Sequence, residues 1–267
     1  MIKITIVGCC GRMGMRIASL ASEDNEIKIA GAVEIKGSPN IGKNLGDIIG
    51  LPKIDVKIND DLKRAVGDSD VIIDFTKPTV TLTSLSVARE LKIPIVIGTT
   101  GITDEELRVI KSASSSIPVL YSSNMSVGVN LLFKIVPEMA KALGQDYDIE
   151  IVEAHHNKKK DAPSGTAMTL AEQIAQARDL RLKDSVLYGR EGNVGQRPKD
   201  QIGVHAVRGG GIVGDHTVYF VGANERIEIT HRAHSRDIFA QGALVAAKYI
   251  ADKSPGLYNM QNAIEGV

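Results

Sequence analysis

The fold is decided by residues 2–14, which read I-K-I-T-I-V-G-C-C-G-R-M-G. The β-branched run at residues 2–7 stops at Gly8, which predicts a buried strand. Glycines follow, and residues 13–21 are predicted to continue as a helix. A strand, a glycine-rich turn and a helix in this order are typical of a dinucleotide-binding site.

The glycine-rich turn is the first candidate site. Its glycines let the backbone approach a pyrophosphate, and the start of the following helix offers N–H groups and the positive end of a dipole. The candidate cofactor contacts are Gly8, Cys9, Cys10, Gly11, Arg12, Met13 and Gly14. The spacing is G-x-x-G-x-x-G, with Cys10 where a second glycine usually stands. The alternative is a turn that needs glycine only for its positive φ angles.

The end of the second predicted strand, residues 27–33, bears on the choice of cofactor. Glu34 follows this strand directly and is placed to accept hydrogen bonds from an adenosine ribose. Its charge repels a 2′-phosphate and favours NADH, whereas Lys36 attracts that phosphate and favours NADPH. We therefore expect NADH or NADPH to be used, with NADH slightly favoured.

Strands and helices alternate through the first half of the chain. Further strands are predicted at residues 56–58, 71–75, 93–97 and 119–121, and helices at residues 80–91 and from the capping-box pattern that begins at Thr103. This alternation predicts an α/β fold class with an N-terminal Rossmann-type, doubly wound parallel sheet covered by helices on both faces.

The pattern changes after about Met125. Helices are predicted at residues 129–143, 166–177 and 237–250, and strands at residues 148–154, 202–207, 216–221 and 226–230. Successive strands joined by turns indicate a second, α+β domain with a mixed sheet. We expect residues 1–127 and 237–267 to form the dinucleotide-binding domain and residues 128–236 the substrate-binding and oligomerisation domain. Residues 184–201 are expected to be a loop.

Residues 153–166, which read E-A-H-H-N-K-K-K-D-A-P-S-G-T, form the second candidate site. The final Ser-Gly-Thr begins a helix, and such a start binds a carboxylate or a phosphate through backbone N–H groups and the Thr hydroxyl. A lysine near a histidine supplies both a cation and a candidate proton donor. Lysine runs are more often solvated, which is the interpretation we favour for Lys158 and Lys160. Six histidines without a usable third-ligand spacing and two adjacent cysteines predict no metal site.

Composition limits the class of protein. The chain has 267 residues and a formal net charge of +0, which argues against a nucleic-acid binder that works by bulk electrostatics. No stretch approaches the ~20 apolar residues of a membrane span, and the first residues are too short an apolar run for a signal peptide. With only two cysteines, the chain is expected in a reducing, cytoplasmic setting.

The chain resembles the 4-hydroxy-tetrahydrodipicolinate reductase (dihydrodipicolinate reductase) family. The most specific motif is E-A-H-H-x-x-K-x-D-A-P-S-G-T-A at residues 153–167. Shorter motifs of the family match G-R-M-G at residues 11–14, D-F-T at 74–76, G-T-T-G at 98–101 and N-x-S-V-G-V-N at 124–130. The resemblance extends from residue 4 to the C-terminal helix.

The resemblance implies a role for each matching residue. His155 is similar to the family's catalytic histidine, and Lys159 to its catalytic lysine, a proton donor. Substrate binding is implied for His156, Gly165 and Thr166, the last two as the pair that holds a substrate carboxylate. Cofactor contacts are implied for the turn, and for Glu34, Phe75, Thr76, Gly98, Thr99, Thr100, Ser122, Ser123, Asn124 and Met125. Ile35 stands where some members carry Arg, which weakens the expectation of a strong NADPH preference.

The implied activity is the NAD(P)H-dependent reduction of (2S,4S)-4-hydroxy-2,3,4,5-tetrahydrodipicolinate to 2,3,4,5-tetrahydrodipicolinate, with loss of water, in the diaminopimelate route to lysine. Ring C4 of this dicarboxylate accepts a hydride, and Lys159 or His155 supplies a proton. The resemblance also implies a homotetramer. Two alternatives stay open: another two-domain NAD(P)-dependent dehydrogenase, and a nucleotide-sensing binding module without turnover.

Overall fold

The strand β1 (Ile2–Val7) lies inside a parallel sheet in the computed structural model, which describes residues 1–266. It pairs in parallel with β2 (Ile27–Val33) on one side and with β4 (Val71–Asp74) on the other. Ile4 and Ile6 are fully buried. A strand with neighbours on both sides and helices on both faces has little exposed surface, which is why its β-branched residues are nearly continuous.

The described residues of this sheet form seven strands in the order β12-β6-β5-β4-β1-β2-β3, and all neighbours pair in parallel. The remaining strands are β3 (Ile58–Asn59), β5 (Ile95–Ile97), β6 (Pro118–Tyr121) and β12 (Gly256–Tyr258). The predicted Rossmann-type parallel sheet is confirmed. The strand predicted at residues 56–58 begins only at Ile58, and β12 was not predicted.

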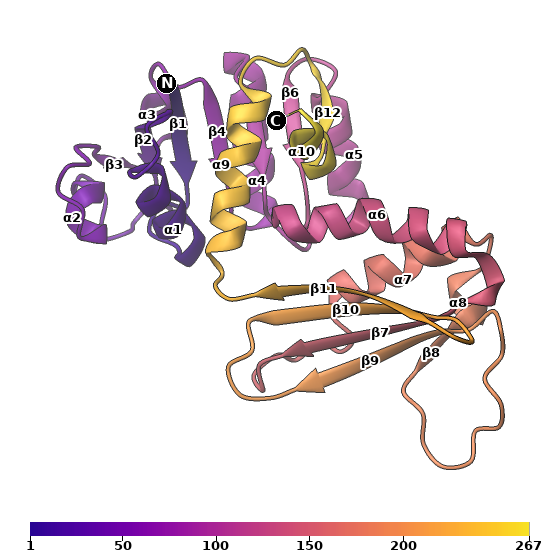
Figure 1. Cartoon of the computed structure of the whole chain (residues 1–267). Helices are drawn as coiled ribbons and strands as arrows, with labels where there is room; N and C mark the ends of the chain where they lie inside the picture. Colours follow the sequence, from indigo (N-terminus) through magenta and orange to yellow (C-terminus); the bar gives the residue numbers. More distant parts are fainter. Residues whose placement is uncertain (267) are drawn as a thin grey trace. The chain divides into compact units, whose positions relative to one another are not determined.

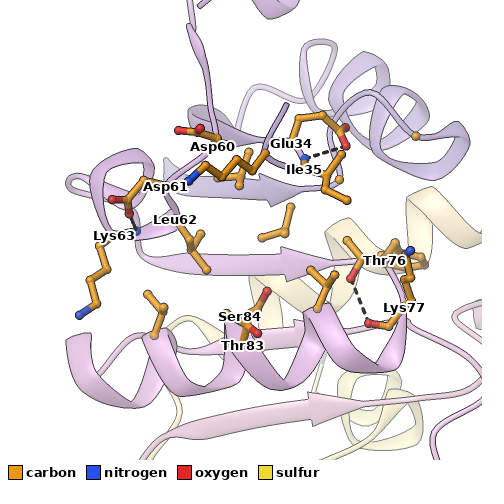
Figure 2. A pocket seen from close by; sticks show the side chains of 18 residues that line it. Glu34, Ile35, Asp60, Asp61, Leu62, Lys63, Thr76, Lys77, Thr83 and Ser84 are labelled. Atoms are coloured by element: carbon orange, nitrogen blue, oxygen red, sulfur yellow. Dashed lines mark hydrogen bonds between the residues drawn. The ribbon is translucent and has the colours of Figure 1, made fainter. Parts of the chain in front are cut away.

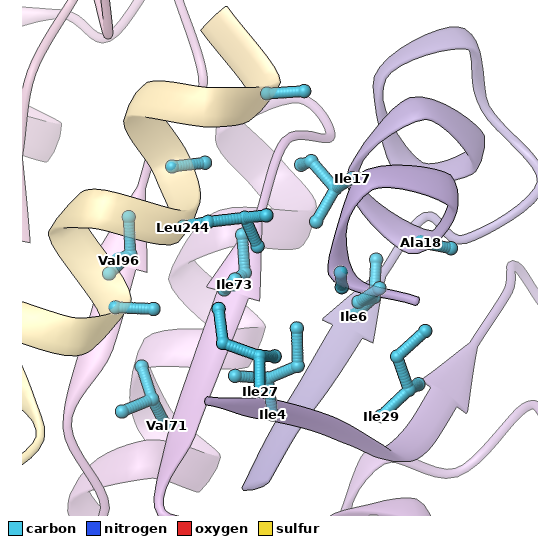
Figure 3. Packing of buried hydrophobic residues seen from close by; sticks show 14 of the residues in the cluster. Ile4, Ile6, Ile17, Ala18, Ile27, Ile29, Val71, Ile73, Val96 and Leu244 are labelled. Atoms are coloured by element: carbon cyan, nitrogen blue, oxygen red, sulfur yellow. The ribbon is translucent and has the colours of Figure 1, made fainter. Parts of the chain in front are cut away.

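Helices cover both faces of the parallel sheet (Figure 1). One face carries α1 (Arg12–Ala21), α9 (Asp237–Ile250) and α10 (Met260–Glu265), and the other carries α3 (Leu62–Val66), α4 (Pro78–Leu91) and α5 (Asp104–Ala113). Alternate strand residues point to opposite faces. In β4, Ile73 therefore packs with Ile17 of α1 and Leu244 of α9 (Figure 3), whereas Ile72 packs with Leu85 of α4.

Two short features complete this part of the chain. The helix α2 (Leu45–Ile49) follows β2 and was not predicted. The capping box predicted at Thr103 is confirmed, because the Thr103 hydroxyl accepts from the Glu106 N–H at 3.3 Å and the Glu106 carboxylate accepts from the Thr103 N–H at 2.8 Å. It fixes the start of α5.

A second sheet has the strand order β11-β10-β7-β9-β8. Its strands are β7 (Asp148–His155), β8 (Val186–Tyr188), β9 (Ile202–Arg208), β10 (Gly214–Val221) and β11 (Arg226–Ala233). The pairs β7–β9 and β8–β9 are parallel, whereas β7–β10 and β10–β11 are antiparallel. The predicted mixed sheet is therefore confirmed.

Helices α6 (Val127–Leu143) and α7 (Gly165–Ala177) pack on one face of the mixed sheet. Burial alternates strictly along β7, with Ile149 and Ile151 facing the helices. Two short helical segments, a 3₁₀ turn at Gly144–Asp146 and α8 (Leu182–Ser185), follow α6 and α7. Within residues 1–266, no helix packs on the opposite face of the sheet, and Val207 on that face is 47% exposed.

The prediction of a loop over residues 184–201 is wrong at its start. Ser185 ends α8, and Val186–Tyr188 forms β8, which pairs with the first residues of β9. Three residues are too few to show a period of two, so local pattern could not reveal this strand. Its pairing depends on β9 being in place alongside it.

The described chain divides into two compact units, one of Met1–Val127 with Asp237–Val267 and one of Gly128–Arg236. These bounds coincide with those expected from the change of pattern along the sequence. The roles assigned to the two units remain predictions. None of the helices described has both the length and the apolar character needed to span a membrane.

Candidate functional site

The glycine-rich turn joins β1 to α1. Gly8 has φ +75°, and a Cβ there would lie 2.8 Å from Thr76 Cγ2. A Cβ at Gly14 would lie 2.2 Å from the Gly8 carbonyl oxygen, so the helix can approach the turn only without that carbon. Gly11 is the N-cap of α1 and brings no side-chain hydrogen bond to the first turn. The first N–H groups of a helix have no acceptor within it, so this end can bind an anion.

Glu34 lies beside the glycine-rich turn because β1 and β2 are in register, with Val7 opposite Val33. Its Oε2 accepts from the Cys10 N–H at 2.9 Å and its Oε1 from the Ile35 N–H at 2.9 Å. The carboxylate is thus held at the carboxyl edge of the sheet. Burial raises the pKa of both neighbouring thiols, Cys9 and Cys10.

The loops after β4 and β5 are tied together by Asp74, which is fully buried. Its Oδ1 accepts from the Thr76 N–H at 3.0 Å and from the hydroxyls of Thr76, Thr81 and Thr99 at 2.6, 3.2 and 3.2 Å. Thr99 is buried with it, whereas Thr100 is exposed. A single carboxylate therefore positions two of the predicted cofactor contacts.

Phe75 and Gly98 contact each other across the same two loops. A Cβ at Gly98 would lie 2.2 Å from Phe75 Cζ, so the ring covers the glycine. The next loop along the sheet, after β6, is held by Ser122, whose hydroxyl donates to the Asn124 carbonyl oxygen at 2.7 Å. The carbonyl oxygen of Met125 approaches α9 at Gly242, where a Cβ would lie 1.7 Å away. Ser123 is exposed.

A pocket of about 910 Å³ opens at this carboxyl edge (Figure 2). Among its lining residues are the predicted cofactor contacts Gly8, Gly11, Glu34, Phe75 and Thr76. Others that line it are Ile35, Lys36, Asp60, Asp61, Leu62, Lys63, Lys77, Val80, Thr83, Ser84 and Val87. The remaining predicted contacts, including Ser122 to Met125, are not among them. Ligands of open α/β sheets bind outside the carboxyl ends of the strands, as this pocket lies.

The second set of predicted residues lies in the other unit, around the carboxylate of Glu153. Glu153 has no exposed surface, and its Oε2 lies 2.6 Å from His155 Nδ1. Its Oε1 accepts from the Ser164 N–H at 3.0 Å, and both oxygens accept from the Arg208 guanidinium at 2.7 Å. Burial acts to raise the pKa of Glu153, but hydrogen bonds from Arg208 and His155 outweigh it and hold the pKa below its ordinary value.

His155 at the end of β7 also contacts His216 of β10, edge to face, with ring centroids 5.2 Å apart. His216 Nε2 lies 2.9 Å from the Ser164 hydroxyl. Burial, with a smaller contribution from His155, lowers the pKa of His216 from 6.5 to about 4. His216 is therefore neutral at pH 7. The hydrogen bond of His155 to Glu153 directs its other ring nitrogen, Nε2, away from that carboxylate.

Ser164 is the N-cap of α7, and its hydroxyl accepts from the Ala167 N–H at 3.2 Å. The predicted carboxylate-binding residues Gly165 and Thr166 are the first two residues of this helix. Gly165 is exposed, and a Cβ there would meet no atom within 4 Å. The start of α7 is thus open to a ligand while its cap is buried.

Lys159 differs from its two neighbours in the lysine run. Its ammonium group lies 2.8 Å from Asp161 Oδ2 and its side chain is 20% exposed, whereas Lys158 and Lys160 are exposed. The hydrogen bond from Lys159 holds the pKa of Asp161 below its ordinary value. Arg208, the partner of Glu153, also donates to the Asp161 carbonyl oxygen at 2.7 Å.

The structure thus brings His155, Lys159 and the start of α7 into one hydrogen-bonded network. The His156 side chain has a separate partner, because its Nε2 lies 3.5 Å from an Arg236 nitrogen. The supporting residues Arg208 and His216 were not predicted. The spacing of two between Glu153 and His155 on a strand does place them on one face, and this signal could have identified Glu153.

A Rossmann-type unit with this turn, joined to a second α+β unit, is an architecture found among NAD(P)H-dependent oxidoreductases. The family model described as dihydrodipicolinate reductase, N-terminus, matches residues 2–125, and the model described as dihydrodipicolinate reductase, C-terminus, matches residues 128–264. The chain belongs to the dihydrodipicolinate reductase family.

Relatives from other organisms cover almost the whole chain. The 4-hydroxy-tetrahydrodipicolinate reductases of Geotalea uraniireducens and Trichlorobacter lovleyi are 49% and 50% identical over 264 residues, which is 99% of each chain. A dipicolinate-bound dihydrodipicolinate reductase from Paenisporosarcina sp. TG-14 has the same fold, with a TM-score of 0.75, 24% identity and 98% of both chains covered. An amine dehydrogenase from Mycobacterium smegmatis shares the fold at a TM-score of 0.62 and 10% identity, over 98% of this chain and 95% of its own.

Proposed function

We propose that this chain reduces 4-hydroxy-tetrahydrodipicolinate, with loss of water, using NADH or NADPH. The observation that carries the proposal is the buried carboxylate of Glu153, which binds both His155 and the backbone of Ser164. One group thereby holds the candidate proton donor and the candidate carboxylate-binding helix start. A ring dicarboxylate that must be protonated after reduction needs both. A reduced nicotinamide, when bound, would supply the hydride.

In this proposal the residues of the second unit bind the substrate and deliver the proton. The N–H groups of Gly165 and Thr166 donate hydrogen bonds to a substrate carboxylate, and the ammonium group of Lys159 supplies a positive charge, with His156 as a further contact. Lys159 or His155 donates the proton. Asp161 orients Lys159, with which it forms an ion pair at 2.8 Å, and Glu153 orients His155.

The test is a coupled assay in which the upstream synthase supplies the substrate and the loss of reduced nicotinamide is followed. We expect Lys159→Ala to lower turnover about 10²- to 10⁴-fold. The matched control is Lys160→Ala, an exposed neighbour in the same run, which should stay near the wild-type rate. Turnover near wild type in both His155→Gln and Lys159→Ala would contradict the proposed mechanism.

Binding and turnover separate the two alternatives. A dinucleotide-sensing module predicts NADH binding and no reduction of this substrate by the wild-type chain. A different dehydrogenase predicts turnover of another substrate and none in the coupled assay. The proposed function predicts that Lys159→Ala keeps its affinity for NADH and loses turnover.

We further propose that NADH is slightly favoured over NADPH. Support comes from Glu34, which is held at the turn by two backbone N–H groups, and from Ile35, which offers no charge to a 2′-phosphate. Lys36 lines the same pocket and is the cation that would allow NADPH. In side-by-side assays, Glu34→Gln should shift the ratio of kcat/KM values toward NADPH and Lys36→Ala toward NADH. No change in that ratio for either variant would contradict these roles.

The assembly and the setting are also proposals. The mixed sheet leaves one face open, with Val207 47% exposed, and a homotetramer formed through this face would cover it. The chain's only two cysteines are free thiols in the structure, which supports a location in the reducing cytoplasm.

A further inference from the structure

Cys9 and Cys10 are the only cysteines of the chain, and the fold brings a third metal-ligating side chain beside them. Their two sulfurs lie 3.9 Å apart. The register of β1 with β2 sets Glu34 at the same edge of the sheet. The two sulfurs and a carboxylate oxygen of Glu34 all lie within 4.8 Å of one another.

The separation of the two sulfurs fits a single tetrahedral ion. Zinc–sulfur bonds of about 2.3 Å at a tetrahedral angle set two sulfurs about 3.8 Å apart. Glu34 Oε2 already accepts from the Cys10 N–H, which directs the carboxylate toward the cysteines. Each carboxylate oxygen has two lone pairs, so one on Oε2 is available to an ion. A fourth position is left for water.

We propose that Cys9, Cys10 and Glu34 form a binding site for one thiophilic divalent cation, of which Zn²⁺ and Cd²⁺ are examples. Two metal–sulfur bonds form, each thiol releases its proton to solvent, and nothing is oxidised or reduced. Sulfur ligands select such ions over Mg²⁺ and Ca²⁺, which prefer oxygen. The prediction of no metal site considered the histidines and the two cysteines, because the sequence does not show that Glu34 joins the cysteines.

The cation and the dinucleotide compete for the carboxylate of Glu34. This competition rests on the proposed function, in which NADH or NADPH binds at the turn. Glu34 lines the pocket together with Gly8 and Gly11 of the turn. An ion on Glu34 takes the charge and the lone pair that a ribose hydroxyl would use. Loss of one charge-assisted hydrogen bond weakens binding about tenfold or more. Saturating cation should therefore raise the Kd for NADH by at least about that factor.

The experiment titrates the full-length, metal-free chain with Cd²⁺ and follows the ultraviolet charge-transfer band of cadmium–thiolate bonds. Since the chain has no other cysteine, this band reports on Cys9 and Cys10. We expect one Cd²⁺ per chain with the band present. The double variant Cys9→Ser/Cys10→Ser should lose the band and bind Cd²⁺ at least about tenfold more weakly. The control His205→Gln removes a different imidazole beside a carboxylate, Glu150, and should keep the band.

Cadmium binding without the thiolate band, or binding unchanged in the double variant, would overturn the site. Cys9 is fully buried, so circular dichroism is used to check that each variant folds. Cys10 is only half-buried, and it is therefore also replaced alone, as Cys10→Ser. NADH binding is first measured without Cd²⁺. Failure of NADH to bind then counts against the proposed function only, whereas an NADH Kd unchanged at saturating Cd²⁺ overturns the competition.

Discussion

Glu153 is a carboxylate with no exposed surface, and burying such a charge is costly unless it is paired and hydrogen-bonded. Arg208 supplies two hydrogen bonds at 2.7 Å, and the Ser164 N–H and His155 supply the others. The same three partner residues lie at the candidate site. Glu153 is therefore a positioning residue that acts on substrate chemistry through His155 and the start of α7.

We expect Glu153→Gln to lower kcat about 10²-fold or more while the Kd for NADH stays unchanged, because the variant removes the charge that orients His155. The matched control is Glu150→Gln on the same strand, whose carboxylate pairs with Arg190 and Arg197 on the opposite face. Steady-state kinetics and cofactor titration measure both variants. Equal losses of kcat in the two would show that the effect is general destabilisation.

His216 makes stability depend on pH in a defined window. Its pKa is lowered from 6.5 to about 4 in the fold, so between these values the unfolded chain binds the extra proton and the folded chain does not. The stabilisation of the folded state by neutral His216 is fully present above pH 6.5, and it is lost as the pH falls toward about 4. It amounts to about 3 kcal/mol. Urea unfolding across this window should give a smaller loss of stability in His216→Gln than in the wild type; equal slopes would contradict this.

At the scale of elements, the carboxyl ends of parallel strands bring distant loops to one edge. The loops after β1, β2 and β4 all line the 910 Å³ pocket. Asp74 and the contact of Phe75 with Gly98 fix the β4 loop against the β5 loop. Packing between loops therefore shapes the pocket.

Gly98→Ala tests that packing. Its Cβ would lie 2.2 Å from Phe75 Cζ, so the ring, which lines the pocket, must move. Overpacking of this kind costs about 1–3 kcal/mol of stability, and we expect NADH affinity to fall with it. The control Gly209→Ala adds a Cβ that meets nothing within 4 Å and should leave both unchanged. Thermal unfolding measures stability, and fluorescence titration measures NADH affinity. An unchanged NADH Kd in Gly98→Ala would show that the position of the Phe75 ring does not affect cofactor binding.

At the scale of the whole molecule, the two units each complete their own core. The open face of the mixed sheet bears Val152 of β7, Thr217 of β10 and Val207 of β9, since these alternate with the residues that face the helices. An open sheet face with exposed apolar residues is typical of an interface. The homotetramer proposed above would bury it.

Val207→Asp should therefore shift the assembly toward smaller species in size-exclusion chromatography with light scattering, since a buried unpaired charge opposes association. Val109→Asp is the control, because Val109 lies on α5 of the other unit and is 43% exposed. A change of assembly in the control alone, or in neither variant, would argue against this interface.

Local patterns in the sequence were enough to predict the main elements. The β-branched run before Gly8, the capping box at Thr103 and the strand pattern of residues 148–154 are short-range signals, and they correspond to β1, α5 and β7. The family motifs at residues 153–167 likewise lie in one stretch of chain. Such features depend on neighbours a few residues away, so they can be predicted without knowledge of the fold.

The tertiary structure alone decided which of these features meet. Glu34 lies beside Cys10, Arg208 beside Glu153 and His216 beside Ser164, although each pair is separated by at least 24 residues. Their contacts depend on strand register and on how helices pack against the sheets. The sequence by itself therefore determined the main elements and the family of this protein. Folding determined the network around Glu153 and the proposed cation site, because both join residues that no local period relates.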